Sequence, residues 1–218
     1  MFAPNWHSNA QAGGSYSYKT LTCLLLDENT DLISFGYDAD YNYSRYNTAE
    51  VTNKPKEWEN YYYFRNYKMA IYAREDLSDD TPIEAAGGKH LRAIVVFTRT
   101  IEFFRRELYK HFVNNGSLRK PKAPNAAKQF ENFDLINATW VITVPAIWDE
   151  PAKQLMKRAA LKAGINNENL VIALEPECAA IYCRQLSKSQ LQIYEEEGNI
   201  NHIVHPGAVL MVVDIGGK

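Results

Sequence analysis

The residues best suited to chemistry lie where two apolar, strand-like runs end. Glu175 directly follows the run LVIAL, and Asp214 follows the run AVLMVV, just before Gly216 and Gly217. Glycines allow backbone N–H groups to approach an anion, and a carboxylate can order the water shell of Mg²⁺. The pattern is compatible with phosphate and magnesium, but a turn glycine pair and a strand-end carboxylate explain it equally well.

Other reactive residue types do not form a recognisable site. His202 and His205 lie three residues apart, but no further ligand has metal-binding spacing, which favours two surface histidines. The sequence has no G-x-S-x-G, H-E-x-x-H, Walker or G-x-G-x-x-G motif. The residues alone therefore predict an α/β domain with one phosphate-compatible sheet end. A small unrelated enzyme that uses Glu175 and Asp214 is a weaker alternative.

The elements that must position these groups are clearest in the centre of the chain. Residues 140–144 form an apolar run that ends at Pro145, and residues 152–163 carry apolar side chains at helical spacing. A second apolar run, residues 170–174, ends at Glu175. Two buried strands joined by a helix predict a parallel crossover unit. Ligands gather at the carboxyl ends of such strands, where Pro145 and Glu175 lie.

The sequence before this unit predicts a hairpin and a long helix. Two β-prone runs, residues 20–26 and 32–37, are separated by a polar turn. Residues 84–114 carry an apolar stripe at spacings of three and four, which predicts a helix whose start Gly87 and Gly88 interrupt or delay.

Three further segments complete the outline. Residues 58–73 are dense in aromatic side chains, which favours packing over base stacking, and they hold the stems of Arg65 and Lys68. Residues 178–194 are expected to be helical, and residues 208–215 are expected to form a buried strand.

Composition excludes several classes of function. The net charge of the 218-residue chain is −2 with both signs interspersed, so no electrostatic footprint for nucleic acid or a membrane surface is present. No signal peptide and no run of about 18 apolar residues is evident. The three cysteines lack a C-x-x-C pair, which suits a reducing compartment and predicts a cytoplasmic protein.

Five motifs carry a resemblance to a known family. WVITVPAIWDEPAKQLMKRAALKAGI resembles the strand–helix signature in the nucleotide-binding domain of the 70-kDa heat-shock protein family, and VPAIW with ALEPECAAIYCRQL is similar to its divergent 12A/12B branch. SFGYDA, FRNYKM and VVDIGG occur in the order expected of that branch. The resemblance covers nearly all of residues 18–218.

The resemblance implies an actin-like ATPase fold, in which two ribonuclease-H-like lobes enclose ATP and Mg²⁺. After an irregular segment at 1–19, residues 20–207 are expected to be a partial lobe one with an inserted subdomain at about 36–114. Residues 208–218 then begin lobe two. The sheet is expected to be incomplete, because the strand beside the one ending at Pro145 has no counterpart.

The resemblance also assigns roles to single residues. Lys68 matches the lysine that helps to position the attacking water, and Glu175 matches a carboxylate associated with the water shell of the metal. Asp214, Gly216 and Gly217 match the second phosphate-binding loop, so Asp214 and Glu175 would hold Mg²⁺ through water.

A conformational relay is implied as well. Pro145 matches a proline proposed to couple nucleotide state to the rest of the molecule. Lys153 lies where mainstream members have an arginine of the same relay. A lysine keeps the charge but lacks the bidentate fork of arginine.

Departures from the family pattern shape the functional expectation. The D-x-G-T-T loop has no counterpart, Lys218 stands where a third glycine is expected, and the second lobe is absent. We therefore expect a fragment of the nucleotide-binding domain that inherits ATP or ADP binding but lacks competence as an ATPase. The alternative is a pseudo-ATPase or non-catalytic scaffold that binds a partner chain or co-chaperone. Chaperone-like action and stress response enter as family terms only.

Overall fold

The computed structural model describes residues 6–7, 16–17, 19–47, 59–72, 74–114, 138–183, 207 and 211–212. In chain order the elements are β1 (Trp6–His7), β2 (Tyr16–Ser17), β3 (Cys23–Leu26), β4 (Leu32–Phe35), α1 (Tyr37–Asn47), β5 (Tyr62–Arg65), η2 (Tyr67–Ile71), β6 (Pro82–Glu84), η3 (Ala86–Gly88), β7 (His90–Arg92), α2 (Ala93–Asn114), β8 (Trp140–Val144), α4 (Glu150–Lys162), η4 (Asn167–Asn169), β9 (Leu170–Leu174) and α5 (Glu175–Cys183). The fold is mixed α/β with small sheets.

A three-stranded antiparallel sheet forms one half of the molecule, with the order β4-β3-β5. The predicted hairpin is confirmed as β3 and β4, in which Leu24 pairs with Phe35. Asp27 shapes the turn between them, because its carboxylate accepts hydrogen bonds from the backbone N–H groups of Asn29 and Asp31. All four side chains of β3 are buried. This strand is therefore the central strand of its sheet and also part of the core.

The other half contains the parallel crossover unit that the sequence predicts. β8 and β9 pair in parallel, with Val144 opposite Leu174, and α4 connects them. The Asp149 side chain caps α4 by accepting from the backbone N–H of Ala152 at 3.0 Å. Gly164 has a φ of +85° just after the helix, a conformation that glycine adopts without strain.

Helix α2 begins at Ala93, which confirms that Gly87 and Gly88 delay the helix predicted over residues 84–114, and residues 84–92 lie outside it. Gly87 and Gly88 have φ values of +77° and +76°, which an α-helix does not accommodate. The chain there forms the β6–β7 hairpin, in which Ile83 pairs with Leu91 and turns its side chain into the core. The residues before α2 therefore form a hairpin and not a first helical turn.

Helix α5 also differs from its prediction, because it begins at Glu175 and not at residue 178. Pro176 lies in the first turn of α5. Backbone N–H groups in a first turn make no hydrogen bond within the helix, so proline, which lacks this group, is tolerated there. Residues 184–194, for which a helical continuation was expected, lie outside the described residues.

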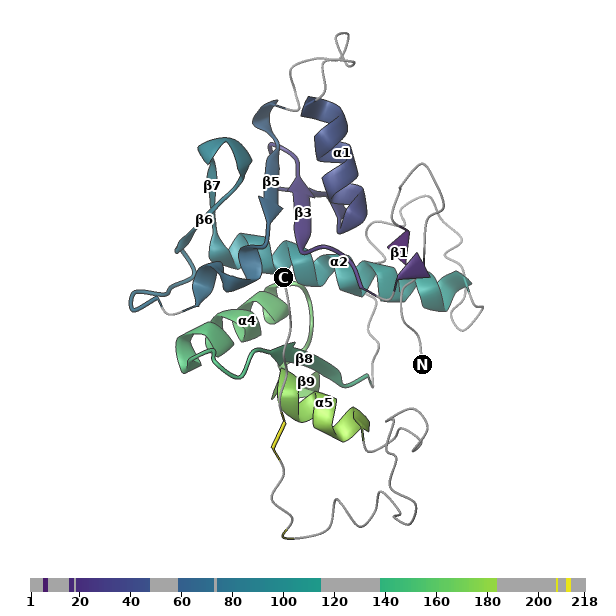
Figure 1. The fold of residues 1–218 in the computed structure, drawn as a ribbon, viewed down its shortest axis with the longest axis vertical. Helices are drawn as coiled ribbons and strands as arrows, with labels where there is room; N and C mark the ends of the chain where they lie inside the picture. The colour runs from purple at the N-terminus through teal and green to yellow at the C-terminus, as the bar shows by residue number, and fades with distance from the viewer. Residues whose placement is uncertain are drawn as a thin grey trace.

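Helix α2 runs between the two halves and packs against both (Figure 1). On one side, Arg99 Nε donates to the Thr30 carbonyl at 2.7 Å. On the other, Arg105 Nη1 donates to the Ala163 carbonyl at 3.0 Å, and Thr98 Oγ1 donates to the Ala159 carbonyl at 3.4 Å. A single buried cluster extends through these contacts from the three-stranded sheet to α4. No helix among the described residues is long and apolar enough to cross a membrane.

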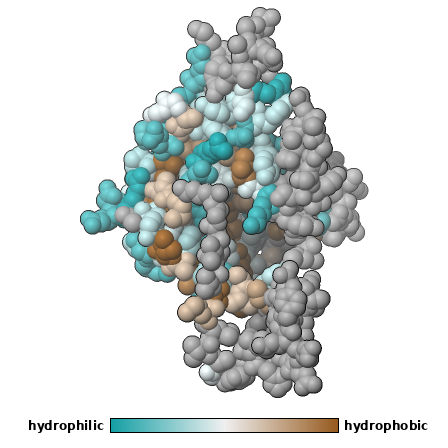
Figure 2. Space-filling view, viewed as in Figure 1, coloured by the Kyte–Doolittle hydropathy of each residue, from teal (hydrophilic) through white to brown (hydrophobic). Residues whose placement is uncertain are grey.

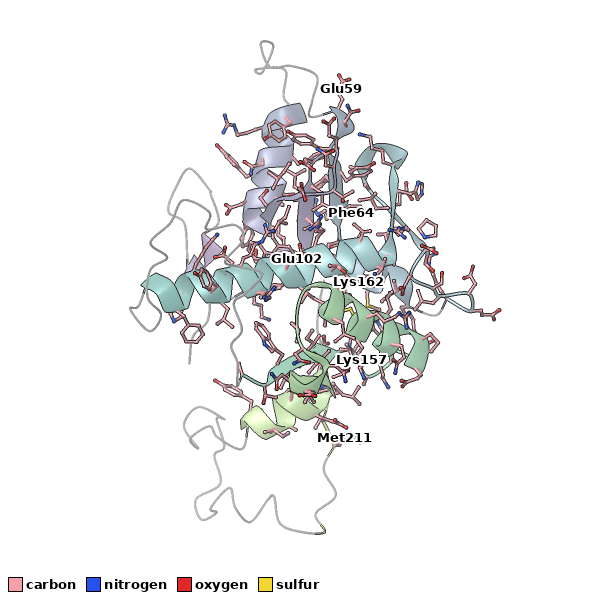
Figure 3. All side chains as sticks on the ribbon, turned by 180° about the vertical axis from the view of Figure 1, so that it is seen from behind. Glu59, Phe64, Glu102, Lys157, Lys162 and Met211 are labelled. Carbon is pink, nitrogen blue, oxygen red and sulfur yellow. The ribbon has the colours of Figure 1, made fainter. Side chains whose placement is uncertain are left out.

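Phe64 illustrates how the three-stranded sheet contributes to this core. Its side chain is fully buried and lies between β5 and α2 (Figure 3). Tyr63 and Phe64 are both buried although their side chains leave opposite faces of the strand, so β5 is covered on both sides. The prediction that the aromatic segment serves packing is confirmed for these residues.

A second buried cluster joins α1 to the sheet. The Tyr63 hydroxyl donates to Asp40 Oδ1 at 2.6 Å and contacts Cys23 Sγ at 3.4 Å, while the ring stacks on Tyr43 at a centroid distance of 4.1 Å. Burial and the hydrogen bond to Asp40 raise the pKa of Tyr63, and burial raises the pKa of the Cys23 thiol. Both groups therefore remain neutral at physiological pH.

We expect Tyr63→Phe to lower the free energy of unfolding by about 1–3 kcal/mol, because Asp40 loses its hydrogen-bond donor in a partly buried setting. Urea titration followed by circular dichroism measures this change. Tyr62→Phe is the matched control on the same strand, since the Tyr62 hydroxyl makes no hydrogen bond to the described part of the chain. Equal stability of the two variants would contradict the prediction.

Candidate functional site

Two residues that the sequence singled out separately form an ion pair. Lys68 Nζ donates to Glu175 Oε1, although the two residues lie 107 positions apart. Lys68 belongs to η2, beside the three-stranded sheet, and Glu175 is the first residue of α5, beside the parallel sheet. The Lys68 side chain is 41% exposed and that of Glu175 is 31% exposed, so solvent and ligands can reach both groups.

Tyr67 fixes the element that carries Lys68. Its buried hydroxyl shares a hydrogen bond of 2.5 Å with Thr100 Oγ1 on α2, and Thr100 Oγ1 also donates to the Val96 carbonyl. The Tyr67 ring contacts Phe97 edge-on at 5.7 Å. Burial raises the pKa of Tyr67, which keeps it a neutral hydrogen-bonding group. The position of Lys68 thus depends on α2 through its immediate neighbour.

The parallel register fixes the element that carries Glu175. Val144 and Leu174 are paired, so the residues that follow them, Pro145 and Glu175, lie at neighbouring strand ends. This arrangement is the one predicted from the two apolar runs. The Pro145 carbonyl accepts a hydrogen bond from the Trp148 backbone N–H at 3.1 Å, which closes the turn before α4.

Lys68 and Glu175 line a cavity of about 500 Å³. Its remaining wall is mostly apolar and comes from residues 20–22, from α2 and from β8. Trp148 also lines it, and its buried Nε1 has no hydrogen-bond acceptor among the described residues. The cavity therefore combines an ion pair with a mostly apolar wall.

The proposed relay residue Lys153 lies elsewhere. It lines a separate cavity of about 390 Å³ between α4 and β9, together with Glu150, Lys157 and Glu177. No ion pair joins Lys153 to Glu175 in the described part of the chain. The structure thus brings Lys68 to Glu175, places Pro145 at the neighbouring strand end, and leaves Lys153 apart.

Several predicted site residues cannot be placed. Asp214, Gly216 and Gly217 lie outside the described residues, as do His202 and His205. Sequence reasoning in turn missed Tyr67, Thr100 and Trp148, which support the ion pair or line its cavity. Their spacing carries no signal, because only the tertiary packing around α2 brings them together.

The donor set sets limits on how a metal would be held. Among the described residues, no group of three His, Cys, Asp or Glu side chains could hold a metal directly. Mg²⁺ commonly keeps several waters and takes one or two carboxylates together with substrate phosphates. The single carboxylate of Glu175 beside Lys68 fits that outer-sphere role and does not fit a dedicated metal cage.

Comparison with known proteins identifies homologues. No protein-family model matches the sequence. The chain is 37% identical over 193 residues to human Heat shock 70 kDa protein 12A, a match that covers 86% of this chain and 26% of that protein. It is 40% identical over 178 residues to human Heat shock 70 kDa protein 12B, covering 79% and 23%. The mouse 12A protein is 38% identical over 182 residues.

These matches confirm the resemblance inferred from the motifs, because the homologues are those of the 12A/12B branch. The chain spans about a quarter of the length of these relatives.

We expect the Lys68–Glu175 pair to contribute little to stability. In a double-mutant cycle with Lys68→Met and Glu175→Gln, the coupling in the free energy of unfolding should be below about 1 kcal/mol, because both side chains are partly exposed to solvent. The more exposed Arg92–Asp80 pair is the reference and should couple even less. A coupling of several kcal/mol would show that the pair is a structural clamp.

Proposed function

We propose that this chain, a homologue of Heat shock 70 kDa proteins 12A and 12B over most of its length, forms one wall of an ATP site in an actin-like ATPase domain. The observation that carries the proposal is the ion pair between Lys68 and Glu175, two residues that the family resemblance assigns to nucleotide chemistry. The chain covers only about a quarter of the length of its relatives. ATPase activity of a complete domain is therefore also a proposal.

The two side chains have complementary tasks in this proposal. Phosphoryl transfer depends on positioning and on stabilising charge, with little covalent chemistry by the protein. The Lys68 ammonium would donate hydrogen bonds to the attacking water or to a γ-phosphate oxygen. The Glu175 carboxylate would accept from a water in the shell of Mg²⁺. The metal would supply neutralisation of phosphate charge when bound.

The remaining assignments rest on the resemblance. Asp214, Gly216 and Gly217 would present backbone N–H groups and a carboxylate to phosphate and to the metal's water. Pro145 and Lys153 would belong to the conformational relay. Since Lys153 lines a different cavity from Glu175, the relay would act through α4 and β9 and not through a direct contact. A chaperone-like role under stress and a co-chaperone partner follow from the same resemblance, and a cytoplasmic location is proposed from the cysteine usage.

Isothermal titration with ATP and Mg²⁺ tests the proposal. We expect saturable binding that weakens by at least about tenfold in Lys68→Met and in Glu175→Gln, since each loses a charged hydrogen-bonding group. Lys157→Met is the control, because Lys157 lies on α4 and lines the other cavity (Figure 3). Absence of heat at millimolar ATP from a sample that circular dichroism shows to be folded would refute nucleotide binding.

A second candidate function is that of an interaction protein that accepts a strand at the free edge of β8. Four consecutive residues, Trp140–Thr143, line the 500 Å³ cavity. Since successive side chains of a strand point to opposite faces, consecutive residues can line one cavity only along the strand's edge. In the described residues β8 pairs with β9 alone, which lies on its other side.

The chemistry of the cavity matches a peptide strand. Its mostly apolar wall suits alternating apolar side chains. Apolar side chains also gather at the surface over β8, β9 and α5 (Figure 2), where Val141 is 53% exposed and Val171 is 47% exposed. An added strand of the length of β8 would span about 17 Å.

Two-dimensional NMR of the tryptophan indole groups checks this candidate. A short peptide of alternating valine and threonine should shift the indole N–H resonances of Trp140 and Trp148, because both residues line the cavity; Trp148→Phe identifies the Trp148 resonance. The control peptide carries proline at alternate positions and lacks the N–H groups needed for pairing. Equal responses to both peptides, or none at millimolar concentration, would exclude strand addition at β8.

A further inference from the structure

A third cavity, the η2 cavity, lies beside η2 and carries an excess of cationic side chains. Its volume is about 470 Å³, and it is bounded by the end of β5, by η2 and by the β6–β7 hairpin. Tyr67 lines this cavity as well as the one that contains Lys68 and Glu175, so η2 borders both. Lys68 lines only the cavity that contains Glu175, and Arg65 and Arg74 line only the η2 cavity.

The charges that line the η2 cavity are not balanced by the protein. Arg65, Arg74 and His90 line it together with one carboxylate, Glu84. With histidine neutral, two guanidinium groups and one carboxylate leave a net charge of +1 on its wall. No ion pair among the described residues involves Arg65, Arg74 or Glu84. Two guanidinium groups share a concave space without a carboxylate partner.

Local structure fixes the backbone of Arg65 and the guanidinium of Arg74. Arg65 is the last residue of β5 and pairs with Cys23, so the sheet fixes its backbone. Arg74 Nε donates to the Ala70 carbonyl at 2.7 Å, which ties the guanidinium to η2 and leaves its other N–H groups for a ligand. Arginine presents several donors in a planar fork that matches phosphate oxygens.

We propose that this cavity is an oxyanion site that binds a phosphate group through Arg65 and Arg74. The ligand is free phosphate or the phosphate of a small metabolite, because the cavity has the volume of a small-molecule site and its donors match a tetrahedral anion. His90 and the carboxamide of Asn66 supply further polar contacts at the rim. This site is separate from the proposed nucleotide site and does not depend on it.

Titration with inorganic phosphate, followed by calorimetry and by NMR of the arginine Nε–H groups, tests the site. We expect saturable binding that weakens at least tenfold in Arg65→Gln and in Arg74→Gln. Arg65→Lys should give an intermediate loss, because it keeps the charge and loses the fork. Arg92→Gln is the matched control and should bind normally, since Arg92 lies on β7 in an exposed pair with Asp80. A phosphate monoester titrated in parallel separates the two sources of the phosphate group.

Lys68→Met distinguishes this site from the nucleotide site. It should leave phosphate binding unchanged, whereas loss of phosphate binding in Lys68→Met with retention in Arg65→Gln would place the anion beside Glu175 and overturn the proposal. Absence of saturation at tens of millimolar phosphate in the folded wild-type chain would overturn it as well. Circular dichroism of each variant confirms that a lost signal reflects the site and not unfolding.

Discussion

The packing of α2 between the three-stranded sheet and α4 is the constraint on which the candidate site depends. Its apolar stripe contacts the three-stranded sheet on one side and α4 on the other, and Phe97 lies at this junction against both Tyr67 and Trp148. Thr100 on the same helix holds Tyr67, next to Lys68. Arg105 and Thr98 hold the end of α4, which precedes β9 and Glu175. Lys68 and Glu175 meet because the three-stranded sheet and the parallel crossover unit both pack against α2.

The ion pair itself is held loosely by comparison with its surroundings. Desolvation penalises a fully buried pair, and full exposure leaves two charges with little mutual attraction. Side chains that are 41% and 31% exposed lie between these limits, so each group keeps a partner at rest and can exchange it for a ligand. The rigid parts of the structure are the apolar contacts around α2, and the charges are placed where they can be reached.

Local patterns predicted the central unit because its elements are specified locally. The apolar periodicity of α4 and the two strands need no distant information, and they lie where the sequence placed them. Helix α1 went unnoticed because its polar and aromatic residues give only a weak apolar stripe. The delay of α2 by Gly87 and Gly88 was predicted, but the β6–β7 hairpin before it was not, because the apolar stripe continues into those residues. The resemblance singled out Lys68 and Glu175, but their contact is a product of tertiary packing and cannot be read from spacing.

The two candidate functions are physically linked because they share one cavity. Trp140–Thr143 of β8 line this cavity on the strand side. Lys68 and Glu175 line the same cavity. A strand that pairs with β8 and stops short of the ion pair would order the wall beside it and favour nucleotide binding. A strand that reaches the pair would compete for the Lys68 ammonium. By reciprocity, a nucleotide would then strengthen or weaken strand binding by the same factor, so the sign of this coupling reports how far the occupant extends along β8.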